Sequence, residues 1–224
     1  IVAASGGNYE QLTPHTAPVS TTVTDDGDLT TVSLAATASV IEGTAITYTA
    51  TLTNAAQTPV TVTLSNGATI DIAAGATSGT VTVAAPGDDP YVDAGTVSAT
   101  IATATGGNFE NLQIDPAAAD TAVTDDSDPT ILDLSATASV AEGGSIVYTA
   151  TLSSAAQTPL TVTLSTGQTI AIAAGATSGS VTIAAPAEDV YVDAGSVSRS
   201  ITATSGGNFE NLQLGTMSAT TAVS

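Results

Sequence analysis

The 224-residue sequence has no cysteine, no tryptophan and no lysine, and its only basic side chains are one arginine and one histidine. Without cysteine there are no disulfide bonds, so another constraint has to stiffen the chain if it works outside a cell. Asp+Glu 21 against Lys+Arg 1 gives a net charge of −20. Nucleic acids and anionic membranes both need clustered cations on the protein, so we expect neither as a partner.

Long apolar runs are also missing, because no segment approaches the roughly 18 residues of a membrane span. Direct membrane insertion is therefore not expected. The start IVAASGGNYE lacks the basic and apolar parts of a signal peptide. We accordingly interpret the sequence as an internal excerpt of a longer chain. Its hydrophobic content of 42%, mostly Ala and Val, is enough to build a folded core.

Internal repetition is the main positive feature of the sequence. TATLTNAAQTP from Thr49 recurs as TATLSSAAQTP from Thr149, and GGNYE at Gly6 recurs as GGNFE at Gly106 and Gly206. The period is about 100 residues, and both full copies must share one fold. We expect a remnant of a preceding repeat at 1–24, an acidic linker at 25–30, repeat 1 at 31–124, a second linker at 125–130 and repeat 2 at 131–224.

Apolar residues alternate with polar ones inside each copy, which predicts β-strands with one buried face. The expected inward residues of repeat 1 are Val32, Leu34, Ala36, Ala38, Val40, Ile46, Tyr48, Ala50, Leu52, Val60, Val62, Leu64, Ile70, Ile72, Val81, Val83, Val97, Ile101 and Val123. No window has a helical pattern. The predicted fold class is all-β, with tandem immunoglobulin-like β-sandwich domains of about seven strands each, arranged end to end.

Seven strands place the loops after the first, third and fifth strands at the end where the chain leaves the sandwich. These loops and the exit itself contain Glu42, Asp88, Asp89, Asp93, Asp125, Asp126 and Asp128. So many like charges close together would repel each other without a cation. Carboxylate oxygens in this number suit Ca²⁺, which takes six to eight oxygen ligands. The sequence therefore predicts a calcium site at the exit end.

The GGNFENL loop is expected at the opposite, entry end of the sandwich. Asn108 and Glu110 would there face the linker residues Asp25, Asp26 and Asp28, so that a cation could clamp neighbouring repeats together. The second copy repeats the acidic loops with Glu142, Glu188, Asp189 and Asp193, but ends before a further Asp pair, so we expect its exit site to be incomplete. Solvated loop carboxylates, or Asp side chains that stabilise turns, are the alternative reading.

The ordered motifs EG, DD-x3-D and DD-x-D, together with TATL(T/S)xAAQTP and GGNFENL, carry a family resemblance over essentially the whole chain. The chain resembles the immunoglobulin-like repeats of giant RTX-type biofilm adhesins and is more distantly similar to Calx-beta domains. The resemblance implies type 1 secretion, an extracellular location on the bacterial surface, and an array that extends a distal binding region. Partners would be neighbouring repeats, with surface glycans contacted through other regions. Calcium would rigidify the junctions, with the seven exit-end carboxylates as ligand candidates.

Three other functions are weighed against this interpretation. An enzyme is not expected, because the positions equivalent to His15 are Asp115 and Gly215, so no Ser-His-Asp site recurs. A carbohydrate- or ice-binding module could use Thr-x-Thr rows such as Thr47–Thr49. A subunit of a polymerising surface filament could donate residues 1–24 as strands to a neighbour.

Overall fold

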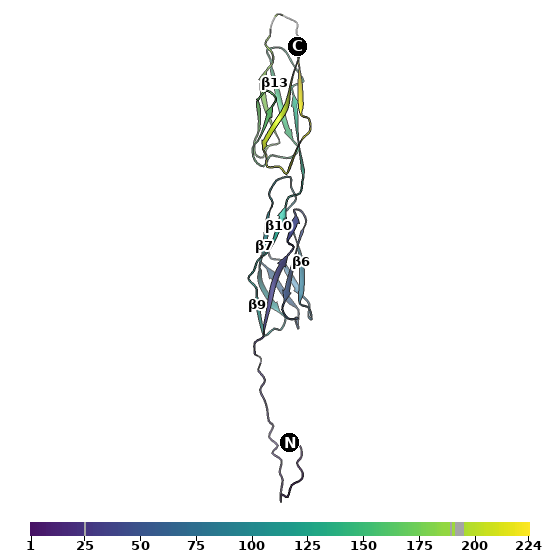
Figure 1. Ribbon diagram of the computed structural model, residues 1–224, viewed down its shortest axis with the longest axis vertical. Coiled ribbons are helices and arrows are strands. Elements are labelled where there is room, and N and C mark those ends of the chain that lie inside the picture. The colour runs from purple at the N-terminus through teal and green to yellow at the C-terminus, as the bar shows by residue number, and fades with distance from the viewer. Residues whose placement is uncertain (25, 189, 191–194) are drawn as a thin grey trace.

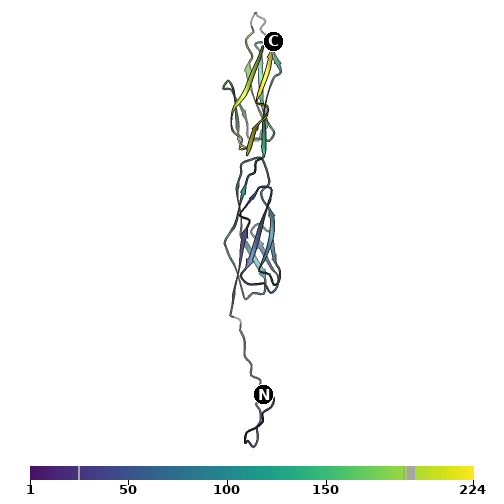
Figure 2. The same cartoon turned by 45° about the vertical axis from the view of Figure 1, so that its right-hand side comes forward.

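The computed structural model describes residues 1–24, 26–188, 190 and 195–224. Two β-sandwiches are stacked along one long axis, and residues 1–24 extend away from the first of them (Figures 1 and 2). Repeat 1 contains β1 (Leu29–Ala36), β2 (Ser39–Ile41), β3 (Ala45–Leu52), β4 (Val60–Leu64), β5 (Thr69–Ile72), β6 (Ser78–Ala84), β7 (Gly95–Ala99), β8 (Ile101–Gly106), β9 (Asn111–Ile114) and β10 (Ala119–Thr124). Repeat 2 contains β11 (Pro129–Ala136), β12 (Ser139–Val140), β13 (Ser145–Leu152), β14 (Leu160–Leu164), β15 (Thr169–Ile172), β16 (Ser178–Ala184), β17 (Gly195–Gly206), β18 (Asn211–Leu214) and β19 (Ser218–Val223).

Each repeat pairs a four-stranded sheet with a second sheet across the core. In repeat 2 the strand orders are β16-β13-β11-β18 and β12-β19-β17-β14-β15. In repeat 1 the four-stranded sheet is β6-β3-β1-β9, and the opposite layer is divided into β2-β10-β7 and β5-β4-β8. The division falls at Thr100, between β7 and β8, whereas β17 is continuous. The tandem all-β sandwich architecture predicted from the sequence is confirmed.

The structure has more strands per repeat than the about seven expected from alternation. The inward series from Val32 to Val40 is divided between two strands, because the chain leaves one sheet after β1 and joins the other as β2. Ala38 lies at this crossing and is exposed. The GGNFENL loop also continues into β9, which pairs in parallel with β1. β2 and β9 have only three and four residues, so alternation gives little signal for them, and the division between β7 and β8 adds one more strand in repeat 1.

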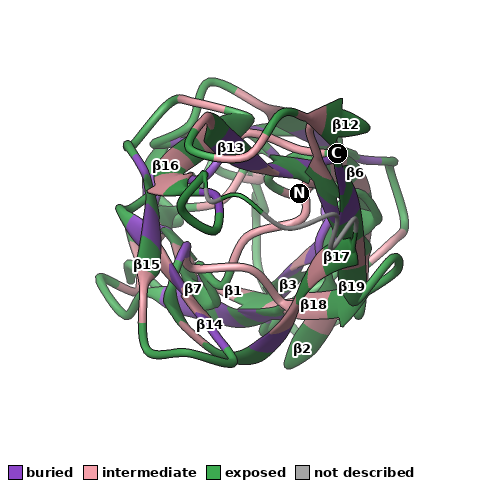
Figure 3. Cartoon of the chain, turned by 90° about the horizontal axis from the view of Figure 1, so that it is seen from above, coloured by how far each residue is buried: buried purple, intermediate pink, exposed green. Residues whose placement is uncertain are grey.

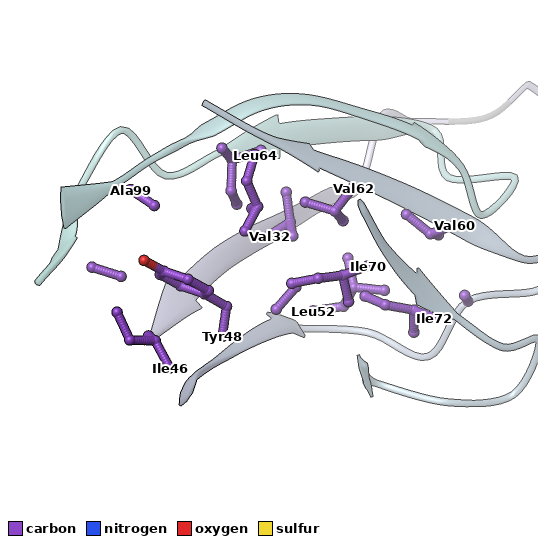
Figure 4. Close-up of a cluster of buried hydrophobic side chains, with 14 residues drawn as sticks. Val32, Ile46, Tyr48, Leu52, Val60, Val62, Leu64, Ile70, Ile72 and Ala99 are labelled. Atoms are coloured by element: carbon purple, nitrogen blue, oxygen red, sulfur yellow. The ribbon is translucent and has the colours of Figure 1, made fainter. Parts of the chain in front are cut away.

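The core of each repeat is formed by the inward faces of the two layers. Along β3 every second side chain is buried, at Ile46, Tyr48, Ala50 and Leu52. Figure 4 shows Ile46, Tyr48 and Leu52 on the same side of the core space as the labelled residues of β4 and β5, between the layers. Seen along the long axis, buried and exposed segments alternate along the strands, and exposed loops surround them (Figure 3). The predicted alternation is thus confirmed for the central strands.

Residues 1–24 form no strand, and their large apolar side chains face solvent. Tyr9 is 70% exposed, whereas Phe109, its equivalent one period later, packs against the core of repeat 1. The difference arises because Phe109 has the other strands of its sandwich around it. Among the described residues, no helix is long and apolar enough to be a membrane span.

Candidate metal centre at the junction between the repeats

Glu42 lies at the centre of the acidic residues at the exit end of repeat 1. It is only 4% exposed. It belongs to three groups of carboxylates, and in each group one oxygen per residue lies within 4.8 Å of the others. The groups are Glu42 with Asp125 and Glu210, Glu42 with Asp89 and Asp93, and Glu42 with Asp88 and Asp126. The structure therefore gathers carboxylates from the loop between β6 and β7, the linker and the next repeat around one buried side chain.

A tight turn after β2 positions Glu42. Its backbone N–H donates to Thr124 O at 3.1 Å, which ties the turn to the last strand of the repeat. Gly43 follows with φ +67°, and its N–H donates to Pro86 O at 2.7 Å. A Cβ on Gly43 would lie 2.8 Å from the Cβ of Asp88. Glycine is needed here because both the backbone conformation and the close approach of the second loop disfavour a side chain.

The linker supplies a further set of carboxylates and is itself bonded to both neighbours. The N–H of Asp93 donates to Asp125 Oδ1 at 3.2 Å, which joins the acidic loop of repeat 1 to the linker. The N–H of Asp128 donates to Glu210 Oε2 at 2.8 Å, which joins the linker to repeat 2. Asp128 belongs to none of the three groups around Glu42. Its backbone instead orients Glu210 toward them.

Glu210 is the residue that brings repeat 2 into the centre, and it is not among the ligands predicted from the sequence. The 100-residue period could have identified Glu210, because Glu110 was expected to face the first linker and Glu210 is its equivalent one period later. Oε1 of Glu210 and Oε1 of Glu42 are both buried without a hydrogen-bond partner. A buried carboxylate oxygen without a donor is costly, and a cation, a shared proton or a water molecule bound between the two side chains would offset that cost.

The electrostatics of the centre favour a bound positive charge. Burial raises the pKa of Glu42 to about 7, together with the hydrogen bond that protonated Glu42 can donate to Glu210 and the negative charges of Glu210, Asp93 and Asp125. Burial and the neighbouring charges of Asp126, Asp128 and Asp89 likewise raise the pKa of Asp88. The chain has one Lys or Arg in total, and this residue, Arg199, bonds the carbonyl of Ser198. An all-oxygen ligand set of this kind fits a hard divalent cation such as Ca²⁺.

The entry end of repeat 1 has a smaller, more exposed acidic group. Oxygens of Asp26, Asp28 and Glu110 lie within 4.8 Å of one another. Glu110 Oε2 accepts hydrogen bonds from the N–H groups of Gly27 at 3.1 Å and Asp28 at 2.6 Å. Asn108 lines the same pocket as Asp28 and Glu110, and its Nδ2 donates to Gln57 Oε1 at 2.8 Å. Asp25, also expected here, lies outside the described residues.

The exit end of repeat 2 repeats the turn of repeat 1. The N–H of Glu142 donates to Ser224 O at 3.3 Å, and Gly143 again has φ +67°. A Cβ on Gly143 would lie 3.7 Å from the N atom of Glu188, so the two predicted acidic loops lie side by side. Asp189 and Asp193 lie outside the described residues.

A second contact between the repeats is formed by Tyr91, next to the acidic loop. Its hydroxyl donates to Ala155 O at 2.7 Å, and its ring lies 6.0 Å from the ring of Phe209, centroid to centroid. The N–H of Val92 donates to Asn208 O at 3.2 Å, and the N–H of Glu210 donates to Pro90 O at 3.1 Å. This loop of repeat 1 is therefore docked on the entry end of repeat 2.

Replacing Tyr91 by alanine is expected to loosen the junction, because the ring contact and the hydroxyl bond are both lost. Tyr91→Phe removes only the bond to Ala155, with an expected cost of about 0.5–1.5 kcal/mol in docking. Residual dipolar couplings of the two repeats measure whether they share one alignment tensor. The tensors should diverge in Tyr91→Ala, less so in Tyr91→Phe, and not in Tyr9→Ala, which changes an exposed tyrosine. Unchanged couplings in Tyr91→Ala would show that this contact does not orient the repeats.

Two sandwiches joined through an acidic junction define an all-β tandem-repeat protein, in which each unit contacts its neighbour along one axis. The LapA domain family matches residues 28–126 and again residues 128–224. The chain therefore belongs to the LapA domain family and contains two consecutive copies of its domain. The comparison with curated proteins found no match.

The family relationship defines the general role of the chain. LapA is a large biofilm adhesin, so the chain is related to biofilm adhesins and is a cell-surface or extracellular protein. The adhesin domain and the all-β fold indicate a structural role.

Proposed function

We propose that the chain is an extender segment of a bacterial surface adhesin, in which Ca²⁺ rigidifies the junction between consecutive repeats. The observation that carries the proposal is the arrangement around Glu42. Its buried carboxylate is shared by three acidic groups, one of which includes Glu210 from the following repeat. A cation bound to Glu42, Asp125 and Glu210 would connect repeat 1, the linker and repeat 2 directly.

Calcium would act here by replacing repulsion with shared coordination. In the absence of a cation, the ionised carboxylates repel one another and push the linker and Glu210 away from repeat 1. A bound divalent ion reverses this effect, because each carboxylate then gains a favourable contact in the closed arrangement. A flexible hinge thereby becomes a rigid joint. The remaining candidates, Asp88, Asp89, Asp93 and Asp126, would complete the oxygen ligands on the side of repeat 1.

The type of adhesin is proposed from the resemblance of these repeats to those of RTX-type biofilm adhesins. Their EG, DD-x3-D and DD-x-D motifs support an RTX-type adhesin that is exported by type 1 secretion and retained on the outer surface of a bacterium. The role of this segment would be to project a distal binding region and so to promote surface attachment or biofilm formation. Its direct partners would be the neighbouring repeats of the same array.

Calcium addition to the metal-free chain tests the proposal. Extracellular-type sites bind with Kd of about 10⁻⁴ to 10⁻³ M, so about 10 mM Ca²⁺ should stabilise the folded state by about 1.4–2.7 kcal/mol per ion. The corresponding rise in Tm is roughly 5–20 °C for a domain of this size. Small-angle scattering should show a longer, stiffer particle at the same time.

The control is a monovalent salt at matched ionic strength, which screens the charges without coordinating to them. The same rise in Tm and length in monovalent salt would mean that screening, not coordination, acts at the junction. If calcium changed neither Tm nor the length of the particle, the chain would be a calcium-independent spacer.

A further inference from the structure

The entry end of repeat 1 contains an open pocket of about 510 Å³. Its lining residues come from the linker, the start of β1, the loop between β3 and β4, and the GGNFENL loop. They are Asp28, Thr30, Asn54, Ala55, Gln57, Asn108, Phe109 and Glu110. Phe109 provides an aromatic wall that packs against the core of repeat 1, and Gln57 and Asn108 form one polar edge.

The corresponding surface of repeat 2 is covered by a loop of repeat 1. Tyr91 lies there against Phe209 and bonds the carbonyl of Ala155. Asn208 bonds both backbone polar groups of Val92. Its backbone carbonyl accepts a hydrogen bond from the N–H of Val92, and its Nδ2 donates to Val92 O at 3.1 Å. These contacts are made by the equivalents of Phe109, Ala55 and Asn108.

The two surfaces have nearly the same chemistry. One period after the lining residues of the pocket, the sequence has Asp128, Thr130, Ser154, Ala155, Gln157, Asn208, Phe209 and Glu210, so that only Asn54 is replaced, by serine. Their backbones also agree, since Asn108 and Asn208 adopt φ of 54° and 60°. Asn108 bonds Gln57, and Asn208 makes the same bond to Gln157. The pocket of repeat 1 is therefore already shaped as a receptor for the same loop.

We propose that this pocket is a docking site for the Tyr-containing loop of another repeat of this kind, placed head to tail before repeat 1. The tyrosine ring would stack on Phe109, its hydroxyl would donate to Ala55 O, and the residue after it would pair with Asn108. The inference extends the proposed extender function by naming the surface through which repeats recognise each other. It does not depend on calcium.

Weak binding is sufficient for such a contact. A short linker holds the next repeat at an effective concentration in the millimolar range, so a dissociation constant of about 1 mM already gives substantial docking. The contact therefore adds orientation to an array whose connectivity is supplied by the chain itself.

A chain extended by one repeat tests the proposal. Residue 1 is in phase with residue 101, so a second copy of residues 29–100 placed before Ile1 completes a sandwich with residues 1–24. Hydrogen exchange should then slow at the amide of Glu110, which would donate to the added loop as Glu210 donates to Pro90. Tyr91→Ala in the added copy alone should restore fast exchange at Glu110 and leave Glu210 unchanged.

A peptide provides a second readout on the 224-residue chain itself. The peptide PGDDPYVDAGT, residues 86–96, is titrated to about 5 mM, the upper range of effective concentration in a linked array. Amide shifts are expected at 108–110 and not at 208–210, where Tyr91 already sits. The same peptide with alanine for tyrosine should cause no shifts.

The docking proposal would be overturned if neither the hydrogen exchange at Glu110 nor the amide shifts at 108–110 changed, or if the tyrosine and alanine forms gave equal effects. Each comparison is made within one buffer and depends on tyrosine alone. The docking proposal can therefore fail while calcium still stiffens the chain, or hold while calcium has no effect on the chain.

Discussion

Replacing Glu42 by glutamine is expected to remove most of the calcium-induced rise in Tm and the calcium-induced stiffening. Glu42 is the one residue common to all three carboxylate groups, so a neutral amide at this position weakens every one of them at once. In calcium-free buffer the same substitution should raise Tm, because it removes a buried negative charge from a site of like charges. Thermal melts and small-angle scattering with and without calcium measure both effects.

The opposite signs make this prediction specific. A substitution that merely damages the fold lowers Tm in both buffers, whereas loss of a cation ligand lowers it only when calcium is present. Glu10→Gln is a matched control, since Glu10 is exposed in the extended segment 1–24. If Glu42→Gln kept the full calcium response, the centre around Glu42 would not be the calcium site.

The stability of the calcium-free chain is expected to fall as the pH rises from about 5 to about 8. The pKa of Glu42 is raised from 4.5 to about 7 in the folded protein. The folded state therefore binds more protons than the unfolded state between these values, and stability is lost as the pH rises through them. Asp88, whose pKa is also raised, contributes in the same direction. Melts of the metal-free chain across this range measure the slope.

Calcium should reverse that slope, because protons and Ca²⁺ compete for the same carboxylates. The calcium-induced rise in Tm should be smallest near pH 5 and largest near pH 8. Glu42→Gln should flatten the calcium-free profile, since the main titrating group is removed. A calcium-free Tm that increased with pH in this range would contradict the assigned direction of the Glu42 shift.

The sandwich fold and the acidic exit end were accessible from the sequence, because both follow from periodic signals. The alternation in β3 specifies which side chains enter the core, and the 100-residue period carries the same inference to β13. Once the strands are placed, topology alone directs the loops with Glu42 and Asp88 to one end of the repeat. The structure brings these two residues together with Asp126.

The parts that could not be derived depend on contacts without a periodic signature. The change of sheet between β1 and β2 is encoded in a few residues around Ala38, where alternation simply continues. The partner of Tyr91 could not be predicted either, because Phe209 lies 118 positions away in the sequence and contacts Tyr91 only after both repeats have folded. A loop carboxylate followed by glycine, as at Glu42, can reach inward, but a loop glutamate is ordinarily solvated, so the groups that surround it could not be derived from the sequence.

The paths of the first and last strands have a mechanical consequence. β1 begins at the entry end of repeat 1 and β10 ends at its exit, so tension along the array enters through one and leaves through the other. Both strands are interior in their sheets, where β1 lies between β3 and β9 and β10 lies between β2 and β7. Their ladder bonds run across the direction of pull and are loaded together in shear, not opened one after another. This strand arrangement should make the repeat resist stretching along its long axis.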